Sequence, residues 1–302
     1  MYSIYKNIVP KIRGKMKELN LTDVAETPEK LIQEKKRFYR TICKKEEEKL
    51  FFKSILSKEK GIRQRFLNEI KFYKALKENT SHPLYRLCPK CLSCSLNPNF
   101  PYLLYEFIPG KTRHSKDRYS LKEIGVIANL LKVINRSPIK IFNSLKKNQI
   151  LNKKEIEKVL FKLKVKNLPK SSIKKFINSS QKKERFNKIK LTLSHGDFSE
   201  ANIVFLKNNV KIIDWEHVAL RNPLYDLADF WINRWRYHQE QKILLKKSYN
   251  FLKGRKRFDG LFRIGILEIS LRDLILFQNI KNNQEIKRAI IQDLNLIDNI
   301  LK

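Results

Sequence analysis

LTLSHGDFSEANIVFLKNNVKIIDWE, residues Leu191–Glu216, alternates short apolar runs with polar residues. The apolar runs Leu191–Leu193, Ile203–Leu206 and Val210–Ile213 have the length and composition of strands. Lys207–Asn209 separates the last two runs and has the polar composition of a turn. We therefore predict that this stretch forms a strand and a loop, followed by a β-hairpin.

Three polar residues lie at the ends of these predicted strands. Asp197 follows the first strand, Asn202 lies five positions further along, and Asp214 ends the hairpin. Phosphoryl transfer needs such a set, because one carboxylate must meet the acceptor hydroxyl while another carboxylate and an amide oxygen hold Mg²⁺. The protein-kinase catalytic loop has the same spacing of Asp, Asn and a later metal-binding Asp. We interpret Asp197 as a catalytic residue and Asn202 and Asp214 as metal ligands.

With His195-Gly196-Asp197 and Asp214-Trp215-Glu216, the chain resembles the aminoglycoside phosphotransferase and choline kinase family. Members of this family look like protein kinases with HGD in place of HRD and D-W/F-E in place of DFG. The resemblance spans roughly residues 37 to 230. The other interpretation is that an HGD turn and a DWE strand end arose separately in a hydrophilic protein.

The resemblance implies a bilobal, protein-kinase-like α+β fold. A small antiparallel-sheet lobe would occupy residues 1–107, and a mostly helical lobe carrying the hairpin would occupy residues 108–302, with a hinge near 106–110. It also implies ATP and Mg²⁺ as cofactors, with transfer of the γ-phosphate to a hydroxyl group of a small molecule.

Lys53 and Glu69 are candidate nucleotide-binding residues. Lys53 lies in the β-rich run Leu50–Leu56, which with Arg37–Cys43 predicts a hairpin. Burying a lysine without an anion is costly, so Lys53 either points to solvent or has a partner. Glu69 adjoins the apolar face of a helix predicted at Arg65–Asn79 and is a candidate partner. In the resembling family, a strand lysine holds the α- and β-phosphates and pairs with a helix glutamate in this order.

Glu106 and Ile108 lie in a turn that follows two further predicted strands, Leu87–Ser95 and Tyr102–Phe107. By the resemblance this turn is the hinge, and the Glu106 carbonyl and the Ile108 amide bond the edge of adenine. The residues alone are equally compatible with a simple strand-to-helix turn.

The chain departs from the family pattern before its first predicted hairpin. The family's nucleotide loop carries glycine or small polar residues, whereas this chain has only TPEKLIQEKKRFYR at residues 27–40 and no G-x-G-x-x-G. Backbone amides near Gln33–Lys36 stay candidates for phosphate contact.

The composition is globular and strongly basic. The chain has 302 residues, of which 42% are hydrophobic, and a formal charge of +35. Such a charge favours a nucleic acid or an anionic membrane as partner. However, lysine is spread along the whole chain with abundant Ile and Asn, which indicates biased codon composition instead. The stretch from His195 to Asp229 is a local exception, because it has six acids against three bases, and a metal would bind there.

Nothing in the sequence indicates a membrane span or a signal peptide, since no apolar run approaches the required ~18 residues. We therefore expect a cytoplasmic protein. Residues 1–34 have apolar residues at helical spacing. This segment is either a helix packed on its own domain or a basic amphipathic helix on a membrane surface.

The spacing of Cys88, Cys91 and Cys94 resembles that of zinc ligands, with Cys43 or His82 as the candidate fourth ligand. The other interpretation is that these are buried thiols of a strand.

The remaining sequence predicts helices. Ser120 and Glu123 form a capping box at the start of one helix, which Pro138 ends. Further helices are predicted at Lys154–Lys164, Ser172–Ser179, Leu224–Tyr237, Leu261–Gln278 and Gln284–Leu301. Asp226 matches a family position at which an aspartate braces the catalytic loop. Asp226 and Asp229 are equally explained as first-turn acids that favour the helix dipole.

The acceptor is less defined. A cationic alcohol such as choline or an amino sugar is favoured by three acids near the site, Glu200, Glu216 and Asp229, together with Trp215, Trp231 and Trp235. The basic surface favours a phosphorylated sugar or lipid instead. Two rival functions are a protein kinase-like enzyme and a non-catalytic module that binds RNA or an anionic membrane.

Overall fold

The computed structural model describes residues 8–23, 37–114, 116–147, 190–207, 209–251 and 255–277. The chain forms two compact units, which we describe separately. The first unit comprises Met1–Thr112, Pro138–Lys146 and Asn202–Val218, and the second comprises Arg113–Ser137, Lys147–Ala201 and Ala219–Lys302.

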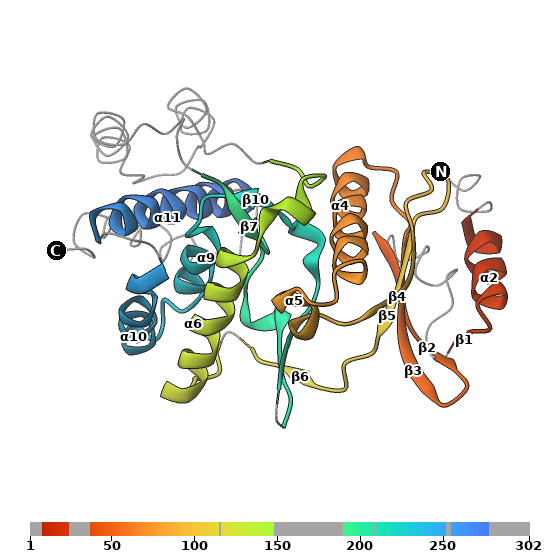
Figure 1. The fold of residues 1–302 in the computed structure, drawn as a ribbon, viewed down its shortest axis with the longest axis horizontal. Coiled ribbons are helices and arrows are strands. Elements are labelled where there is room, and N and C mark those ends of the chain that lie inside the picture. Colours follow the sequence, from red (N-terminus) through yellow and green to blue (C-terminus); the bar gives the residue numbers. More distant parts are fainter. Residues whose placement is uncertain are drawn as a thin grey trace. The chain divides into compact units, whose positions relative to one another are not determined.

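An antiparallel five-stranded sheet lies at the centre of the first unit, with strand order β1-β2-β3-β5-β4 (Figure 1). The strands are β1 (Thr22–Asp23), β2 (Phe38–Lys45), β3 (Glu48–Ile55), β4 (Cys91–Ser95) and β5 (Tyr102–Glu106). The predicted hairpin of β2 and β3 is confirmed. Its strands are longer than expected, because most of the charged residues between the two apolar runs continue the ladder.

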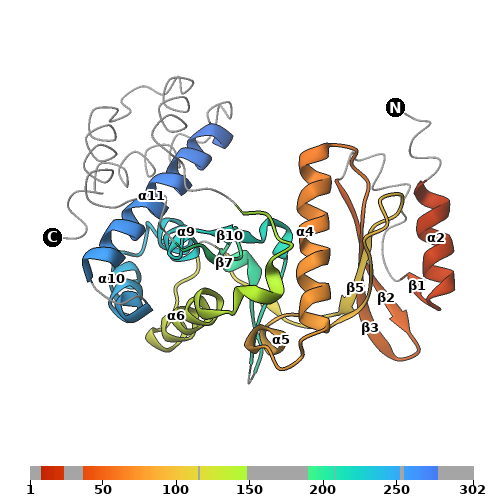
Figure 2. The same ribbon diagram turned by 45° about the horizontal axis from the view of Figure 1, so that its top comes forward.

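Helix α2 (Ile8–Glu18) covers one face of this sheet, and helix α4 (Lys60–Lys77) covers the other (Figures 1 and 2). Ile12 and Met16 of α2 are buried in a cluster with apolar side chains of β2, β3 and β5. The helix predicted near the N-terminus therefore packs on its own domain, as one of the two interpretations expected. In the part of the chain that the structure describes, no helix is long and apolar enough to cross a membrane.

The α4 face of the sheet carries the residues that matter for the site. The register places Arg40, Lys53 and Leu103 in one row across β2, β3 and β5. Because side chains alternate between the two faces of a strand, this row lies opposite the cluster under α2. Aromatic contacts join α4 to the same face, with Phe66 on Phe38 and Tyr73 on Tyr105.

The segment before β4 differs from the prediction. The strand expected at Leu87–Ser95 is wrong in its first part, because Pro83–Leu87 forms the short helix α5 and β4 begins only at Cys91. His82 caps this helix, since its side chain accepts a hydrogen bond from the Leu84 amide at 3.2 Å. Proline at the first helical position also favours a helix start.

The hairpin of Leu191–Glu216 forms as predicted. Strands β8 (Ile203–Phe205) and β9 (Val210–Ile212) pair with each other, and β8 also pairs with β6 (Lys111–Thr112). We expected this hairpin in the helical lobe, but its residues belong to the first unit. The reason is packing: Trp215, just after the hairpin, stacks on Phe72 of α4 with 4.2 Å between ring centroids.

The second unit is mostly helical. Its helices are α6 (Leu121–Arg136), α9 (Tyr225–Asn233), α10 (His238–Ser248) and α11 (Arg255–Phe277), and its strands β7 (Thr192–Ser194) and β10 (Ala219–Arg221) pair antiparallel. Short 3₁₀ turns occupy Ile139–Phe142, Glu200–Asn202, Trp215–His217 and Tyr249–Phe251 of the chain.

The predicted capping box of Ser120 and Glu123 is present at the start of α6. Helix α10 was not predicted, and its buried face includes Glu240 and Gln241. The helices predicted at Lys154–Lys164, Ser172–Ser179 and Gln284–Leu301 lie outside the described residues.

Asp226 in the first turn of α9 holds the loop that follows β7. Its two carboxylate oxygens accept hydrogen bonds from Ser194 Oγ at 2.8 Å, the His195 amide at 2.8 Å and the Gly196 amide at 2.9 Å. The Asp226 side chain makes no capping bond to its own helix, for which Leu224 is the N-cap residue. The bracing interpretation of Asp226 is therefore confirmed.

We predict that Ile12→Ala lowers the free energy of unfolding by about 2 to 5 kcal/mol, because it leaves a cavity where α2 meets the sheet. Lys17→Ala, on the exposed side of the same helix, should change it by no more than about 0.5 kcal/mol. Urea unfolding of the two variants provides the comparison. Equal values for both would mean that α2 does not contribute to the core.

We also predict that Asp226→Asn lowers the free energy of unfolding by about 1 to 3 kcal/mol. An amide has only one acceptor oxygen, so its NH₂ group would face a donor of the braced loop. Asp117→Asn is the matched control, because Asp117 is exposed in the same unit and accepts a backbone bond that an amide oxygen can also accept. Urea unfolding measures both variants, and a control as destabilised as Asp226→Asn would argue against the brace.

Candidate functional site

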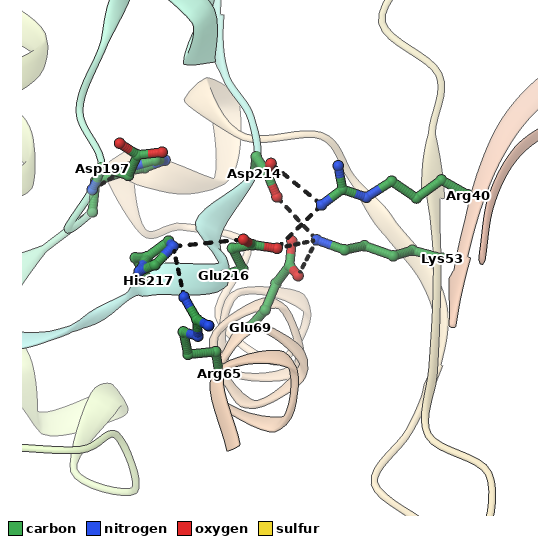
Figure 3. A network of polar contacts seen from close by, with 9 residues as sticks. Arg40, Lys53, Arg65, Glu69, Asp197, Asp214, Glu216 and His217 are labelled. Carbon is green, nitrogen blue, oxygen red and sulfur yellow. Dashed lines mark hydrogen bonds and ion pairs between the residues drawn. The ribbon is translucent and has the colours of Figure 1, made fainter. Parts of the chain in front are cut away.

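Lys53 of β3 lies at the centre of a buried polar network in the first unit (Figure 3). Its side chain is 1% exposed, and its Nζ lies 2.7 Å from Glu69 Oε2 and 2.9 Å from Asp214 Oδ1. A third carboxylate oxygen, Glu216 Oε2, lies 3.4 Å from the same nitrogen. The ion pair that we predicted between Lys53 and Glu69 is therefore present, and it also reaches the end of the β8–β9 hairpin.

The network holds more acid than base. Burial acts to lower the pKa of Lys53, but the carboxylates of Glu69 and Asp214 outweigh it and raise this pKa. Burial raises the pKa of Glu69 and the neighbouring carboxylates of Asp214 and Glu216 add to this effect, so that this pKa is about 7 despite the attraction of Lys53. Each raised pKa means that the group holds its proton more tightly, as expected in a cluster with more carboxylates than cations.

Arg40 and Glu216 are members of this network that the sequence analysis did not assign to it. Arg40 Nη2 lies 3.1 Å from Glu216 Oε2 and 3.5 Å from Asp214 Oδ2 (Figure 3). Burial acts to raise the pKa of Glu216, but the hydrogen bond with His217 and the charges of Lys53 and Arg40 lower it to about 2. The available signals were the pairing of β2 with β3, which sets Arg40 beside Lys53, and the position of Glu216 two residues after Asp214.

Asn202 and Asp214 lie at the open end of the β8–β9 hairpin. The ladder pairs Ile203 with Ile212, and the next pair is closed by a hydrogen bond from the Ile213 amide to the Asn202 carbonyl at 3.0 Å. Asp214 then adopts a left-handed conformation with φ 58°, which turns the chain at this point. Such a backbone conformation is uncommon outside glycine and occurs at functional sites.

The oxygens around Asp214 suit a hard cation. Glu69, Asp214 and Glu216 each offer a carboxylate oxygen, and these three oxygens lie within 4.8 Å of one another. Among the described residues, no other group of three acids, histidines or cysteines is this close. Carboxylate and amide oxygens are the ligands that Mg²⁺ prefers. The chemistry of this donor set therefore fits magnesium.

The zinc hypothesis for the cysteines is wrong for the described chain, since no such group contains them. Cys43 is buried on the α2 face of the sheet, whereas Cys91 pairs with Tyr105 on the other face. His82 is used as a helix cap. The cysteines are free thiols, most of them buried, as the alternative interpretation expected.

A cavity of about 230 Å³ in the first unit connects the polar network to the turn after β5. Lys53, Arg40 and Asp214 line one part of it, and Glu106 and Ile108 line another. The rest of the lining is largely apolar and includes Phe51, Tyr105, Phe107, Val204 and Ile213. A mostly apolar cavity with a few charged groups at one end suits a ligand with an aromatic part and an anionic part.

The side chain of Glu106 is fixed by its surroundings. Glu106 Oε2 accepts a hydrogen bond from the Lys90 amide at 3.1 Å and lies 3.6 Å from Lys211 Nζ. Lys211 itself is buried and donates to the Cys88 carbonyl at 3.1 Å. The turn that follows β5 is therefore anchored to both β4 and β9.

Asp197 lies in the second unit, in the loop that Asp226 braces. The Asp197 amide donates to His195 Nδ1 at 3.3 Å, and the fully buried His195 ring packs on Phe198. His195 thus holds the loop by hydrogen bonding. The Phe198 amide donates to Asp229 Oδ2 at 3.0 Å, so a second acid of α9 also fixes this loop.

Asp229 is itself held by an ion pair, because Arg272 Nη2 lies 3.0 Å from Asp229 Oδ1. Burial raises the pKa of Asp229 to about 7, against the attraction of Arg272. Asp229 is fully buried and faces the loop backbone and α11. The structure therefore gives it a bracing role rather than the acceptor-binding role that we considered.

Two tryptophans considered for binding a cationic acceptor belong to hydrophobic cores. Trp215 is fully buried and stacks on Phe72, and its Nε1 donates to the Ile212 carbonyl at 3.1 Å. Trp231 is 5% exposed and packs edge-on against Phe262. Neither ring face is open to a ligand, so these residues do not support a cationic acceptor.

The chain was compared with known families and proteins. The profile of the phosphotransferase enzyme family matches residues 37–259. A comparison with curated protein sequences gave no match.

Solved structures with the same fold include several kinases. The choline kinase of Streptococcus pneumoniae is 15% identical, with a TM-score of 0.59 and coverage of 95% of this chain and 97% of that chain. A spectinomycin phosphotransferase solved with ADP and spectinomycin is 14% identical, with a TM-score of 0.56 and coverage of 92% and 93%. An ethanolamine kinase of Plasmodium vivax is 13% identical, with a TM-score of 0.52 and coverage of 86% and 79%.

These likenesses confirm the predicted kinase-like α+β fold, with an antiparallel sheet in the N-terminal part and helices in the C-terminal part. The match of the family profile covers well over half of the sequence, and it confirms the predicted enzyme class. The chain belongs to the phosphotransferase enzyme family.

Proposed function

We propose that the protein transfers the γ-phosphate of ATP to a hydroxyl group of a small molecule, with Mg²⁺ as cofactor. The observation that carries this proposal is the buried contact of Lys53 with both Glu69 and Asp214. A lysine that joins a helix glutamate to a metal-binding aspartate is the arrangement that aligns ATP in kinases. Its position beside a mostly apolar cavity supports a nucleotide as the ligand.

The first unit would bind the nucleotide. Lys53, fixed by Glu69, would contact the α- and β-phosphates, and the Glu106 carbonyl and the Ile108 amide would bond the edge of adenine. Asn202 and Asp214 would hold the cation. Bound Mg²⁺ would neutralise the charge that develops on the phosphates.

Asp197 would act on the acceptor. Its carboxylate would orient the acceptor hydroxyl and accept its proton, while the acceptor oxygen forms a bond to the γ-phosphorus. The bond between this phosphorus and the β–γ bridging oxygen breaks, and ADP leaves with the bonding pair. The bonds from Asp226 and Asp229 to the loop support this role, since a base must be positioned within hydrogen-bonding distance of its proton.

The proposal extends to the chemical class of the acceptor. Solved structures with the same fold include kinases named for choline, ethanolamine and spectinomycin, which favours an amino alcohol or an amino sugar. A phosphorylated sugar or lipid is the alternative suggested by the formal charge of +35. ATP consumption with panels of both classes distinguishes them.

We predict that ATP with Mg²⁺ raises the melting temperature of the wild-type protein more than ATP alone, because a ligand of the native state stabilises it. Asp214→Asn should lose the magnesium-dependent part of this shift. Glu78→Gln, an exposed acid of the same unit, should retain it. A wild-type protein that responds to neither mixture would favour a non-catalytic binding module instead.

We predict that Asp197→Asn lowers turnover by about 100-fold or more, the usual contribution of a positioned base. The melting-temperature shift with ATP and Mg²⁺ should be unchanged, because Asp197 is not assigned to the nucleotide. Asp117→Asn is the control and should keep wild-type turnover. Initial rates of ADP release with the best acceptor measure this, and near wild-type rates for Asp197→Asn would remove it from the reaction.

A further inference from the structure

The phosphates of a nucleotide need more donors than one lysine. In kinases, backbone amides of a glycine-rich loop supply them, together with the lysine and metal ions. This chain has no glycine between Gly14 and Gly61, and that interval contains the first three strands of the sheet. Glycine allows a backbone to approach a ligand closely, so the missing glycines leave a need for side-chain donors.

Arg40 is placed to meet this need. It lies on β2 directly opposite Lys53 on β3, on the face of the sheet that lines the cavity. Its side chain is 41% exposed, in contrast to the buried Lys53. Its guanidinium packs over the Phe38 ring at 5.1 Å, which restricts its orientation.

We propose that Arg40 is a nucleotide-binding residue whose guanidinium holds the β- and γ-phosphates in place of a glycine-rich loop. This inference rests on the proposed function, because it names a further residue of the same nucleotide site.

The position of Arg40 relative to Asp214 indicates which phosphates it meets. A cation held by Asp214 would neutralise charge on the β- and γ-phosphates, and Arg40 Nη2 lies 3.5 Å from an oxygen of that same carboxylate. The guanidinium therefore lies near the place where these two phosphates would be held. The planar fork of arginine matches two phosphate oxygens at once, which a lysine does not do.

The present partners of Arg40 are consistent with an exchange. Arg40 now pairs with Asp214 and Glu216, and both pairs are partly exposed. A cation on Asp214 would compete with the guanidinium for that carboxylate, leaving its donors available for phosphate. Because Arg40 is not buried, this exchange needs only a side-chain rotation and no opening of the core.

The experiment compares binding of adenosine, AMP, ADP and ATP, each with Mg²⁺, by calorimetry. Arg40→Met removes the charge and keeps an apolar side chain of similar reach, while Arg40→Lys keeps the charge without the fork. Lys45→Met is the control, because it removes an exposed cation from the same strand.

We expect Arg40→Met to weaken the binding of ADP and ATP by about tenfold or more, the usual contribution of charge-assisted hydrogen bonds. The binding of adenosine and AMP should be unchanged. Arg40→Lys should retain part of the affinity, and Lys45→Met all of it. Unchanged binding of adenosine by Arg40→Met also shows that the variant is folded.

Three results would overturn the proposal. Equal affinity of wild type and Arg40→Met for ATP would show that other groups hold the phosphates. An equal loss for adenosine and ATP would show that Arg40 acts only on the shape of the cavity. A wild-type protein that binds no nucleotide would reject both this inference and the proposed function, whereas the first two results leave the proposed function intact.

Discussion

The buried charge of Lys53 is the constraint on which the first unit depends. An ammonium group that is 1% exposed is tolerated only with close anionic partners. Those partners come from three separate places in the sequence: Glu69 from α4, Asp214 from the end of β9, and Glu216 two residues later. The strand, the helix and the hairpin must therefore assemble together, since removing any one of them leaves charge buried without compensation. The aromatic contacts of α4 with the sheet and with Trp215 bring these elements into that arrangement.

Four of the six acids between His195 and Asp229 fall into two groups with different uses. Asp214 and Glu216 belong to the network around Lys53, whereas Asp226 and Asp229 accept hydrogen bonds from the loop that carries Asp197. The second use is structural, because a short loop of backbone amides is held in one conformation by buried carboxylates. The local excess of acid in a basic chain did not separate the acids that contact Lys53 from those that brace the loop.

Local sequence patterns predicted the structural elements correctly where one short stretch of residues determines them. The β8–β9 hairpin, the Ser120–Glu123 capping box and the pairing of β2 with β3 follow from neighbouring residues alone. Prediction failed where distant residues decide. Whether Trp215 is a ligand platform or a core residue depends on Phe72, more than a hundred residues earlier in the chain. Arg40 and Glu216 join the site only through the register of β2 on β3 and the left-handed turn at Asp214, neither of which can be read from composition. Helix α10 was missed because its buried face includes polar residues, which weakens the apolar periodicity.

The charges of the network indicate what it can accept. Lys53 and Arg40 face Glu69, Asp214 and Glu216, so the group carries a net charge of about −1 when all are ionised. A polyphosphate alone would meet repulsion from these carboxylates, because like charges at short distance repel strongly in a poorly solvated site. A divalent cation reverses the sign to about +1 and makes the same site attractive to phosphate. The fold has thus combined a surplus of acid with two cations on adjacent strands, and this combination suits a metal–nucleotide complex better than either the metal or the nucleotide alone.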